Sequence, residues 1–294
     1  MAKHKTNIVE EMKDLLSDPK NRIKLDDFVT EHLKTFLEAV SLQHFPVQGL
    51  GAQKEEFLKR MKAYEEIVKD LQKIIILVSR WGEGDQLSVL EKIFTRIGEA
   101  DKGSSGLTLW INFNWYPIQI LMYSAGIAAL SAKKYEALKI TLTTPIQYKE
   151  HGYFPLVVPV ASNLADIHDA FKWIPGHEKK YVPKSEHLFE IIETPLHELL
   201  FLGREYEKLF DDFEVYSALI YADAMERDWG PIGRFGWKHS RGIENSPLNR
   251  IIKEAEVMQN KWPPVRVGMF NGSLDRFMEV SKVFKERLDK LSWW

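Results

Sequence analysis

Apolar side chains along this chain recur at alternating steps of three and four residues, which is the spacing of one face of an α-helix. The longest series runs from Phe57 to Val78 and spans three heptads, with charged residues over much of the remaining surface. The same spacing occurs over 29–40 and over 277–291. The pattern predicts an all-α protein, an irregular multi-helix bundle whose helices pack through apolar seams.

One stretch departs from this amphipathic pattern, because residues 103–132 contain no charged side chain. A helix that is apolar on every side is either the buried centre of a bundle or a membrane span. In lipid, Asn112, Asn114 and Gln119 would each need a hydrogen-bond partner, and Pro117 would interrupt the backbone hydrogen bonds. We therefore favour a central buried apolar helix and expect no membrane contact, with a membrane span as the alternative.

Proline and glycine mark the breaks between the helical segments. Residues 44–51 carry one Pro and two Gly between strong helical patterns, which predicts a linker between an N-terminal helical segment, 1–45, and a helical-bundle domain, 52–294. The sequence FPLVVPV at 154–160 is the one plausible strand, and its two prolines predict a short extended or edge segment. Residues 228–247 are rich in Gly, Arg and Trp and predict a loop.

Composition narrows the classes of function. The 294 residues include 40 basic and 42 acidic side chains, which gives a net charge of −2. Because no excess of positive charge attracts phosphates, we do not expect a nucleic-acid partner. The chain has no cysteine, which excludes disulfides and thiolate metal sites and fits a cytoplasmic location. It also has no P-loop, no dinucleotide-binding glycine motif in a βαβ unit, no GxSxG motif and no complete HExxH motif, so we expect no cofactor and no catalytic set of residues.

The segment 229–241 has the most unusual composition in the chain. Its glycines permit tight turns, its aromatic side chains offer stacking faces and its cations offer donors for an anion. This combination fits a nucleotide or single-stranded nucleic-acid site, and it also fits a connector whose aromatic side chains fill the core. The candidate ligand-binding residues of this segment are Arg234, Trp237, Lys238, His239 and Arg241.

Asp223 is a further candidate because it follows the apolar run 218–222 on a predicted long helix. A carboxylate on such a face requires a cationic partner. Arg234 or Lys238, shortly downstream, could supply it. The sequence therefore predicts a structural ion pair here, with a catalytic acid or a ligand-binding residue as the alternative roles of Asp223.

Two other features concern metal ions and partners. Four of the histidines, at 168, 177, 187 and 197, lie about ten residues apart. This spacing places them on different faces or elements, so we predict no metal site.

Trp293 and Trp294 end the chain, where they either dock on the protein or contact a partner.

Several segments resemble a poorly characterised region of other proteins. They are SGLTLWINFNWYPIQILMYSAGIAAL (105–130), FDDFEVYSALIYAD (210–223), WGPIGRFGWK (229–238) and VGMFNGSLDRF (267–277). Together they resemble, in the same order over about the last 240 residues, an α-helical C-terminal region of bacterial multidomain proteins of the anti-phage-defence type. In those proteins the region follows a sirtuin-like or other effector domain. The first fifty residues here are too few for an effector domain. The resemblance implies sensing or regulation rather than chemistry.

These observations leave two hypotheses. The first is a non-catalytic helical sensor or interaction module that binds a protein partner, either an effector or a phage-derived trigger, and regulates an effector supplied in trans. In this hypothesis a homo-oligomer is possible. The alternative is a nucleotide- or nucleic-acid-binding protein, or an enzyme, that uses the segment 229–241.

Overall fold

A computed structural model describes residues 7–49, 51–148, 152–241 and 246–291 of the chain. Over these residues the chain forms fifteen α-helices, a few short 3-10 helices and one two-stranded sheet, which confirms the predicted all-α bundle. Among the described residues no helix combines the length and the apolar character needed to cross a membrane. The α-helices are α1 (Ile8–Ser17), α2 (Arg22–Ala39), α3 (Lys54–Ile67), α4 (Lys69–Trp81), α5 (Ser88–Glu99), α6 (Thr108–Phe113), α7 (Tyr116–Ser131), α8 (Tyr135–Thr143), α9 (Val157–Ala165), α10 (Pro183–Leu200), α11 (Glu205–Met225), α12 (Arg234–Ser240), α13 (Pro247–Met258), α14 (Pro263–Arg266) and α15 (Leu274–Leu288).

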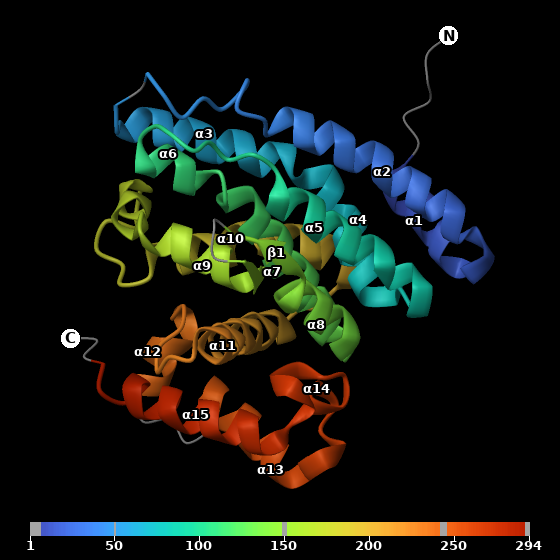
Figure 1. The fold of residues 1–294 in the computed structure, drawn as a ribbon, viewed down its shortest axis with the longest axis vertical. Coiled ribbons are helices and arrows are strands. Elements are labelled where there is room, and N and C mark those ends of the chain that lie inside the picture. Colours follow the sequence, from blue (N-terminus) through green and yellow to red (C-terminus); the bar gives the residue numbers. More distant parts are fainter. Residues whose placement is uncertain (1–6, 50, 149–151, 242–245, 292–294) are drawn as a thin grey trace.

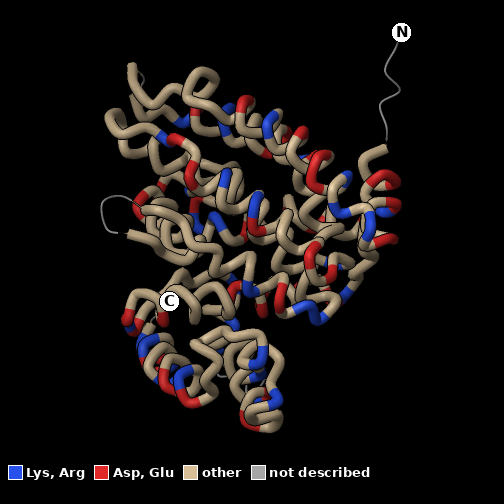
Figure 2. The backbone as a smooth tube through the Cα atoms, turned by 45° about the vertical axis from the view of Figure 1, so that its right-hand side comes forward, with Lys and Arg blue, Asp and Glu red and all other residues tan. Residues whose placement is uncertain are grey.

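The helices are stacked broadly in chain order. Figure 1 shows α1 to α4 at the top, α7 and its neighbours in the middle, and α11 to α15 at the bottom. Buried apolar residues from Met12 in α1 to Leu288 in α15 form one continuous core. The positions of acidic and basic residues are interspersed along the outer helices in Figure 2, in keeping with the nearly balanced charge of the sequence.

The central helix α7 is buried along its length, as the sequence predicts. Every residue from Tyr116 to Leu130 is buried, and α4, α8, α10 and α11 pack around it. Gly126 lets α11 approach closely, because a Cβ at this position would lie only 1.9 Å from the Phe213 ring. The polar side chain of Asn114 accepts a hydrogen bond from Tyr64 at 2.6 Å and donates to the carbonyl of Lys102 at 3.2 Å. A protein environment supplies the partners that lipid would lack.

The predicted apolar seam from Phe57 to Val78 is present but belongs to two helices. The two helices meet at Val68, whose backbone stays in the right-handed helical region (φ −71°, ψ −21°). The seam nevertheless continues, because Phe57, Met61 and Tyr64 of α3 and Leu71, Ile75 and Val78 of α4 are all buried. The α4 portion packs mainly against α7.

The extended segment predicted over 154–160 is only partly correct. Strand β1 (Pro145–Gln147) pairs antiparallel with β2 (Tyr153–Pro155), with Ile146 opposite Phe154. From Val157 the chain is helical instead of extended. Pro159 is tolerated there because it is the third residue of α9, where the backbone N–H has no acceptor within the helix.

The loop predicted over 228–247 also needs correction. Residues 234–240 form the short helix α12, whose Phe235 is fully buried against the core. Residues 242–245 lie outside the described part of the chain. The segment therefore combines a turn, 226–233, with a helix that packs on α11, α13 and α15.

Candidate ligand-binding pocket

A pocket of about 360 Å³ lies where α7, α9, α10 and α11 meet the turn 229–233. We call it the Glu214 pocket. Its walls are formed by apolar side chains such as Ala161, Ala165 and Ile232, among which a few polar groups are placed. This volume lies at the small end of the range for ligand-binding pockets. The side chains with polar groups that line it are Gln119, Tyr123, His168, Tyr181, Lys184, Ser185, Glu214 and Trp229.

Two glycines allow the turn 229–233 to close the pocket against α11. A Cβ on Gly230 would lie 2.4 Å from the carbonyl oxygen of Ala218, and a Cβ on Gly233 would lie 1.9 Å from Oε1 of Glu214. Any larger residue at either position would displace the turn. The glycines of this segment therefore serve close packing of the backbone beside a buried carboxylate.

Glu214 is the central polar group of the pocket and is only 1% exposed. Its Oε1 accepts hydrogen bonds from Oγ of Ser185 at 2.6 Å and from the hydroxyl of Tyr123 at 3.2 Å. Oγ of Ser185 in turn accepts from the backbone N–H of Arg234 at 3.0 Å. Oε2 has no hydrogen-bond partner of good geometry. The backbone N–H of Phe235 nevertheless stabilises the charged carboxylate and so acts to lower the pKa of Glu214. An unpartnered buried oxygen is costly and is uncommon in folded proteins.

Burial changes the protonation of the groups around the pocket. It raises the pKa of Glu214 to about 7, against the opposing effect of the hydrogen bond from Ser185. Burial also lowers the pKa of Lys184 to about 8, while the charge of Glu214 acts to raise it. The pKa of His168 is lowered by burial and by nearby lysines, foremost Lys184. Titratable groups shifted toward neutrality in one concave site are typical of functional sites.

Gln119 adds a second unpartnered acceptor. It projects from α7 one turn before Tyr123, and its Oε1 is buried with no hydrogen-bond partner. Gln119 and Glu214 line the same pocket, so both unpartnered oxygens belong to residues of its wall. A ligand with suitably placed donors would satisfy both oxygens.

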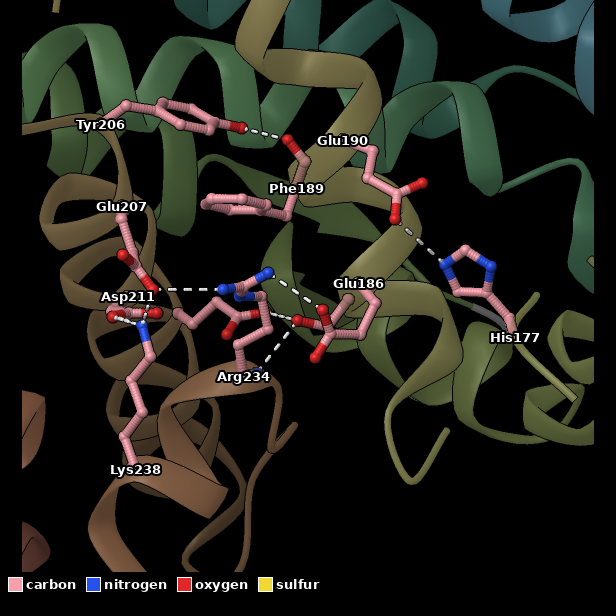
Figure 3. A network of polar contacts seen from close by, with 11 residues as sticks. His177, Glu186, Phe189, Glu190, Tyr206, Glu207, Asp211, Arg234 and Lys238 are labelled. Carbon is pink, nitrogen blue, oxygen red and sulfur yellow. Dashed lines mark hydrogen bonds and ion pairs between the residues drawn. The ribbon is translucent and has the colours of Figure 1, made fainter. Parts of the chain in front are cut away.

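The cations of the predicted site, 229–241, lie beside this pocket but do not line it. Arg234 donates to Glu186 at 2.9 Å and to Glu207 at 3.2 Å, and its guanidinium lies 3.7 Å from the centre of the Phe189 ring (Figure 3). Lys238 donates to Glu207 at 2.7 Å and also to Asp211. Because each cation already has acidic partners, Arg234 and Lys238 are poorly suited to bind an anion such as a phosphate.

The other candidates of this segment are also engaged within the fold. His239 is buried, with Nδ1 3.0 Å from Oγ of Ser246 and Nε2 2.7 Å from a carboxylate oxygen of Asp289. The exposed Arg241 lies over the Trp237 ring at 4.9 Å. The connector interpretation of this segment therefore agrees with the contacts these side chains make.

The ion pair predicted for Asp223 is present but has a different partner. Asp223 accepts a hydrogen bond from Nε of Arg276 on α15 at 2.7 Å, not from Arg234 or Lys238. The reason is distance along the helix. The cations of α12 contact the N-terminal half of α11 at Glu207 and Asp211, and Asp223 lies about 18 Å farther along the helix axis than Asp211.

Sequence reasoning missed the polar residues that line the pocket, although the first part of the predicted segment 229–241 forms one of its walls. Ser185 fits a helix cap by its position, yet α10 already begins at Pro183 and the hydroxyl binds Glu214. The one signal available was Glu214 itself, a charge within the otherwise apolar run 213–222. The predicted partner-contact residues Trp293 and Trp294 lie outside the described residues.

A second, larger groove of about 730 Å³ lies between α3, α4 and α10. Its rim carries exposed charges that pair with each other along the helices, as Lys69 does with Glu66 at 2.5 Å. None of the residues described around this groove has a buried polar atom without a hydrogen-bond partner. We therefore regard the Glu214 pocket as the better candidate site despite its smaller volume.

Comparisons with known proteins do not assign this pocket. No family model, no curated protein and no solved structure matches the chain. The function of the pocket must therefore be inferred from its own geometry.

Proposed function

We propose that this protein is a non-catalytic helical sensor that binds a small polar heterocycle, such as a nucleobase or nucleoside, in the Glu214 pocket. The observation that carries the proposal is that Glu214 and Gln119 line one pocket and each has a buried oxygen, Oε2 and Oε1, without a hydrogen-bond partner. Both oxygens are acceptors when Glu214 is ionised. A heterocycle with a ring N–H and an amino group supplies two donors on one edge. Lys184 offers a donor for an acceptor on the same ligand.

The surroundings favour the heterocycle over its phosphorylated forms. Small apolar walls at Ala161, Ala165 and Ile232 suit a compact, flat molecule. The nearby cations Arg234 and Lys238 are already paired with acidic side chains, so they offer little to a phosphate. We therefore expect a nucleoside to bind more tightly than the corresponding nucleotide.

Thermal unfolding with a panel of nucleobases, nucleosides and nucleotides tests this proposal. A true ligand at 100 times its Kd adds about 2.7 kcal/mol to the stability of the folded state. Gln119→Leu and Glu214→Gln should each weaken binding at least tenfold, because each changes one of the two acceptors. Glu193→Gln, at an exposed position on α10, is the matched control and should bind as the wild type does. A panel without any stabilising compound, or equal stabilisation of all four proteins, would contradict the proposal.

Acid–base catalysis in the same pocket is the second candidate. It is favoured by one observation, the pKa values of Glu214 near 7 and of Lys184 near 8, which suit proton transfer at neutral pH. Mass spectrometry of a bound ligand after long incubation separates the two. Unchanged ligand supports the sensor, whereas conversion that Glu214→Gln abolishes supports an enzyme.

A sensor must pass its state to another molecule, and we propose that this is a protein partner. The resemblance of 105–130 and 210–238 to a helical region of anti-phage-defence proteins supports a regulatory role and suggests an effector acting in trans in the cytoplasm. Pull-down of candidate effectors with and without the ligand tests this step. A partner whose retention changes at least several-fold with ligand is the expected result, and ligand-independent retention of every candidate would contradict it.

A further inference from the structure

Two histidines that lie far apart in the predicted pattern come together beside α10. His177 lies in the turn after the 3-10 helix 168–173, while His187 and Glu190 lie one helical turn apart on α10. One ligand atom from each of the three lies within 4.8 Å of those of the other two. Figure 3 shows His177 turned toward Glu190, with Nε2 of the ring 3.6 Å from Oε1. The two histidines lie on different elements, as their spacing predicts, but the turn folds back onto α10 and brings their side chains together.

The surroundings of His177 leave one of its ring nitrogens available as a metal ligand. Its Nδ1 lies 3.4 Å from the carbonyl oxygen of Pro175, which favours the proton on Nδ1 and leaves the lone pair on Nε2. The side chain is only 6% exposed, and Nε2 has no hydrogen-bond partner. At 3.6 Å, Oε1 of Glu190 is too distant to be that partner. A buried nitrogen lone pair directed toward a carboxylate is unfavourable, and a metal ion bound between the two would remove this repulsion.

His187 has a matching arrangement. Its Nε2 lies 2.7 Å from Oε1 of Glu65 on α3, and that carboxylate also accepts from the hydroxyl of Tyr116 on α7 at 2.8 Å. A carboxylate acceptor holds the proton on Nε2 and leaves Nδ1 with its lone pair. This carboxylate–histidine pair is the outer-shell arrangement found at metal-ligating histidines.

We propose that His177, His187 and Glu190 form a binding site for one Zn²⁺ ion. Two imidazoles and one carboxylate suit zinc, whereas calcium and magnesium favour sites built from oxygen ligands. Zinc–ligand bonds of about 2.0–2.2 Å in a tetrahedron place neighbouring ligand atoms roughly 3.3–3.5 Å apart. The separation of 3.6 Å between His177 and Glu190 is close to this value, and the exposed Glu190 side chain can rotate to complete the site. A water molecule would take the fourth position.

Such an ion would act as a clamp. It would join the turn at His177 to α10, and Glu65 would extend the connection to α3. The site lies on the first turns of α10, close to Lys184 and Ser185 of the Glu214 pocket, but shares no residue with that pocket. Failure of either proposal would therefore leave the other unaffected.

Titration of the full-length, chelator-stripped protein with ZnCl₂ tests the proposal by calorimetry. We expect one equivalent to bind with a Kd of about 1 μM or tighter and to raise the melting temperature. Four-coordinate Co²⁺ in the same site should give an intense visible ligand-field spectrum. Absence of saturable Zn²⁺ binding would overturn the proposal.

Variants locate the ion and protect the test against unfolding. His177→Ala removes one ligand of the ion. Glu190→Gln replaces a second ligand at an exposed position, where the fold should tolerate the change. Each variant should weaken Zn²⁺ binding at least tenfold. Glu65→Gln should weaken it by about 10–100-fold through His187. His197→Ala, at an exposed position on the same helix, is the control and should leave binding unchanged. Binding that survives intact in both His177→Ala and Glu190→Gln would place the ion elsewhere and overturn the proposal.

Discussion

Two polar clusters lie one turn apart on α11 and differ in whether a ligand could complete them. In the first, Arg234 and Lys238 pair with Glu207 and with further acidic side chains nearby. In the second, Glu214 receives hydrogen bonds on one oxygen and none on the other. Unpartnered atoms occur in both clusters, since Oδ1 of Asp211 also lacks a hydrogen bond. Glu214, however, lines the pocket described above, whereas Asp211 does not.

In this protein the type of residue is a poor guide to function. The Gly/Arg/Trp segment has the composition of a ligand site, yet its Arg234 and Lys238 hold α12 against α10 and α11. The carboxylate beside them belongs to an apolar stretch of helix and lines the pocket. The structural cluster has its charges paired within the fold, whereas the candidate site has an unpaired carboxylate oxygen beside a cavity.

The largest expected effect comes from breaking the first cluster. Arg234→Ala leaves Glu186 and Glu207 without their guanidinium partner and removes the stacking on Phe189. We expect a loss of about 3 kcal/mol in the free energy of unfolding, at the lower end for buried pairs because Glu207 is half exposed. Urea denaturation measures it. Arg241→Ala, at an exposed position, should change stability by no more than about 0.5 kcal/mol.

A second prediction uses the pKa of Glu214. Because its folded-state pKa is about 7 and its ordinary value is 4.5, the folded protein keeps a proton that the unfolded chain has lost. The stabilisation is therefore complete below pH 4.5 and is lost as the pH rises through about 7. Each pKa unit of difference between the folded and unfolded states corresponds to about 1.36 kcal/mol. The free energy of unfolding of the wild type should therefore fall by up to about 3 kcal/mol as the pH rises from 4.5 through about 7.

Glu214→Gln is the variant that tests this dependence, because it cannot lose a proton. Denaturation curves between pH 5 and 7.5 should show a falling stability for the wild type and a nearly flat one for the variant. The range stops at 7.5 because Lys184, with a lowered pKa of about 8, adds the opposite trend above it. Parallel curves for the two proteins would show that Glu214 is not the responsible group.

Gly233 lies at the boundary between the two clusters. A Cβ here would meet Oε1 of Glu214 at 1.9 Å, so Gly233→Ala should reduce stability by about 1–3 kcal/mol through overpacking. The same variant should also lower affinity for any ligand of the pocket. Gly51→Ala is the control, since a Cβ at Gly51 has no heavy atom within 4 Å. Equal stability of the two variants in thermal denaturation would contradict the close approach of the turn to α11.

The smallest expected effect concerns the ion pair at the far end of α11. A double-mutant cycle of Asp223→Asn and Arg276→Ala should give a coupling energy of about 0.2–1 kcal/mol, because Arg276 is partly exposed to water. The same cycle with Arg234→Ala in place of Arg276→Ala should give no coupling beyond experimental error. Coupling of Asp223 to Arg234 instead would favour the pairing predicted from the sequence.

Much of the fold could be predicted because helical periodicity is local information. The seam at 57–78 is buried, as is the seam that begins at Phe277 as far as Leu288, and residues 116–130 of the uncharged run form the centre of the bundle. These outcomes follow from spacing alone, since a helix repeats every 3.6 residues whatever surrounds it. The errors occurred where a short element depends on its position, as at Pro159, which begins a helix instead of interrupting a strand.

The partners of charged and polar side chains could not be predicted in the same way. Arg276 is 53 residues from Asp223 in the sequence, and the chain brings them together only when α15 packs against α11. The same holds for His177 and His187, which meet because a turn folds back, and for Ser185 and Glu214.

The sequence by itself determined that this chain is helical and which helix lies at the centre, because burial of apolar faces is set by residue spacing. Only the tertiary structure decided which polar groups are neutralised and which remain available to a ligand. That distinction depends on contacts between residues far apart in the chain, and on whether a space is left beside them, neither of which is encoded in local pattern.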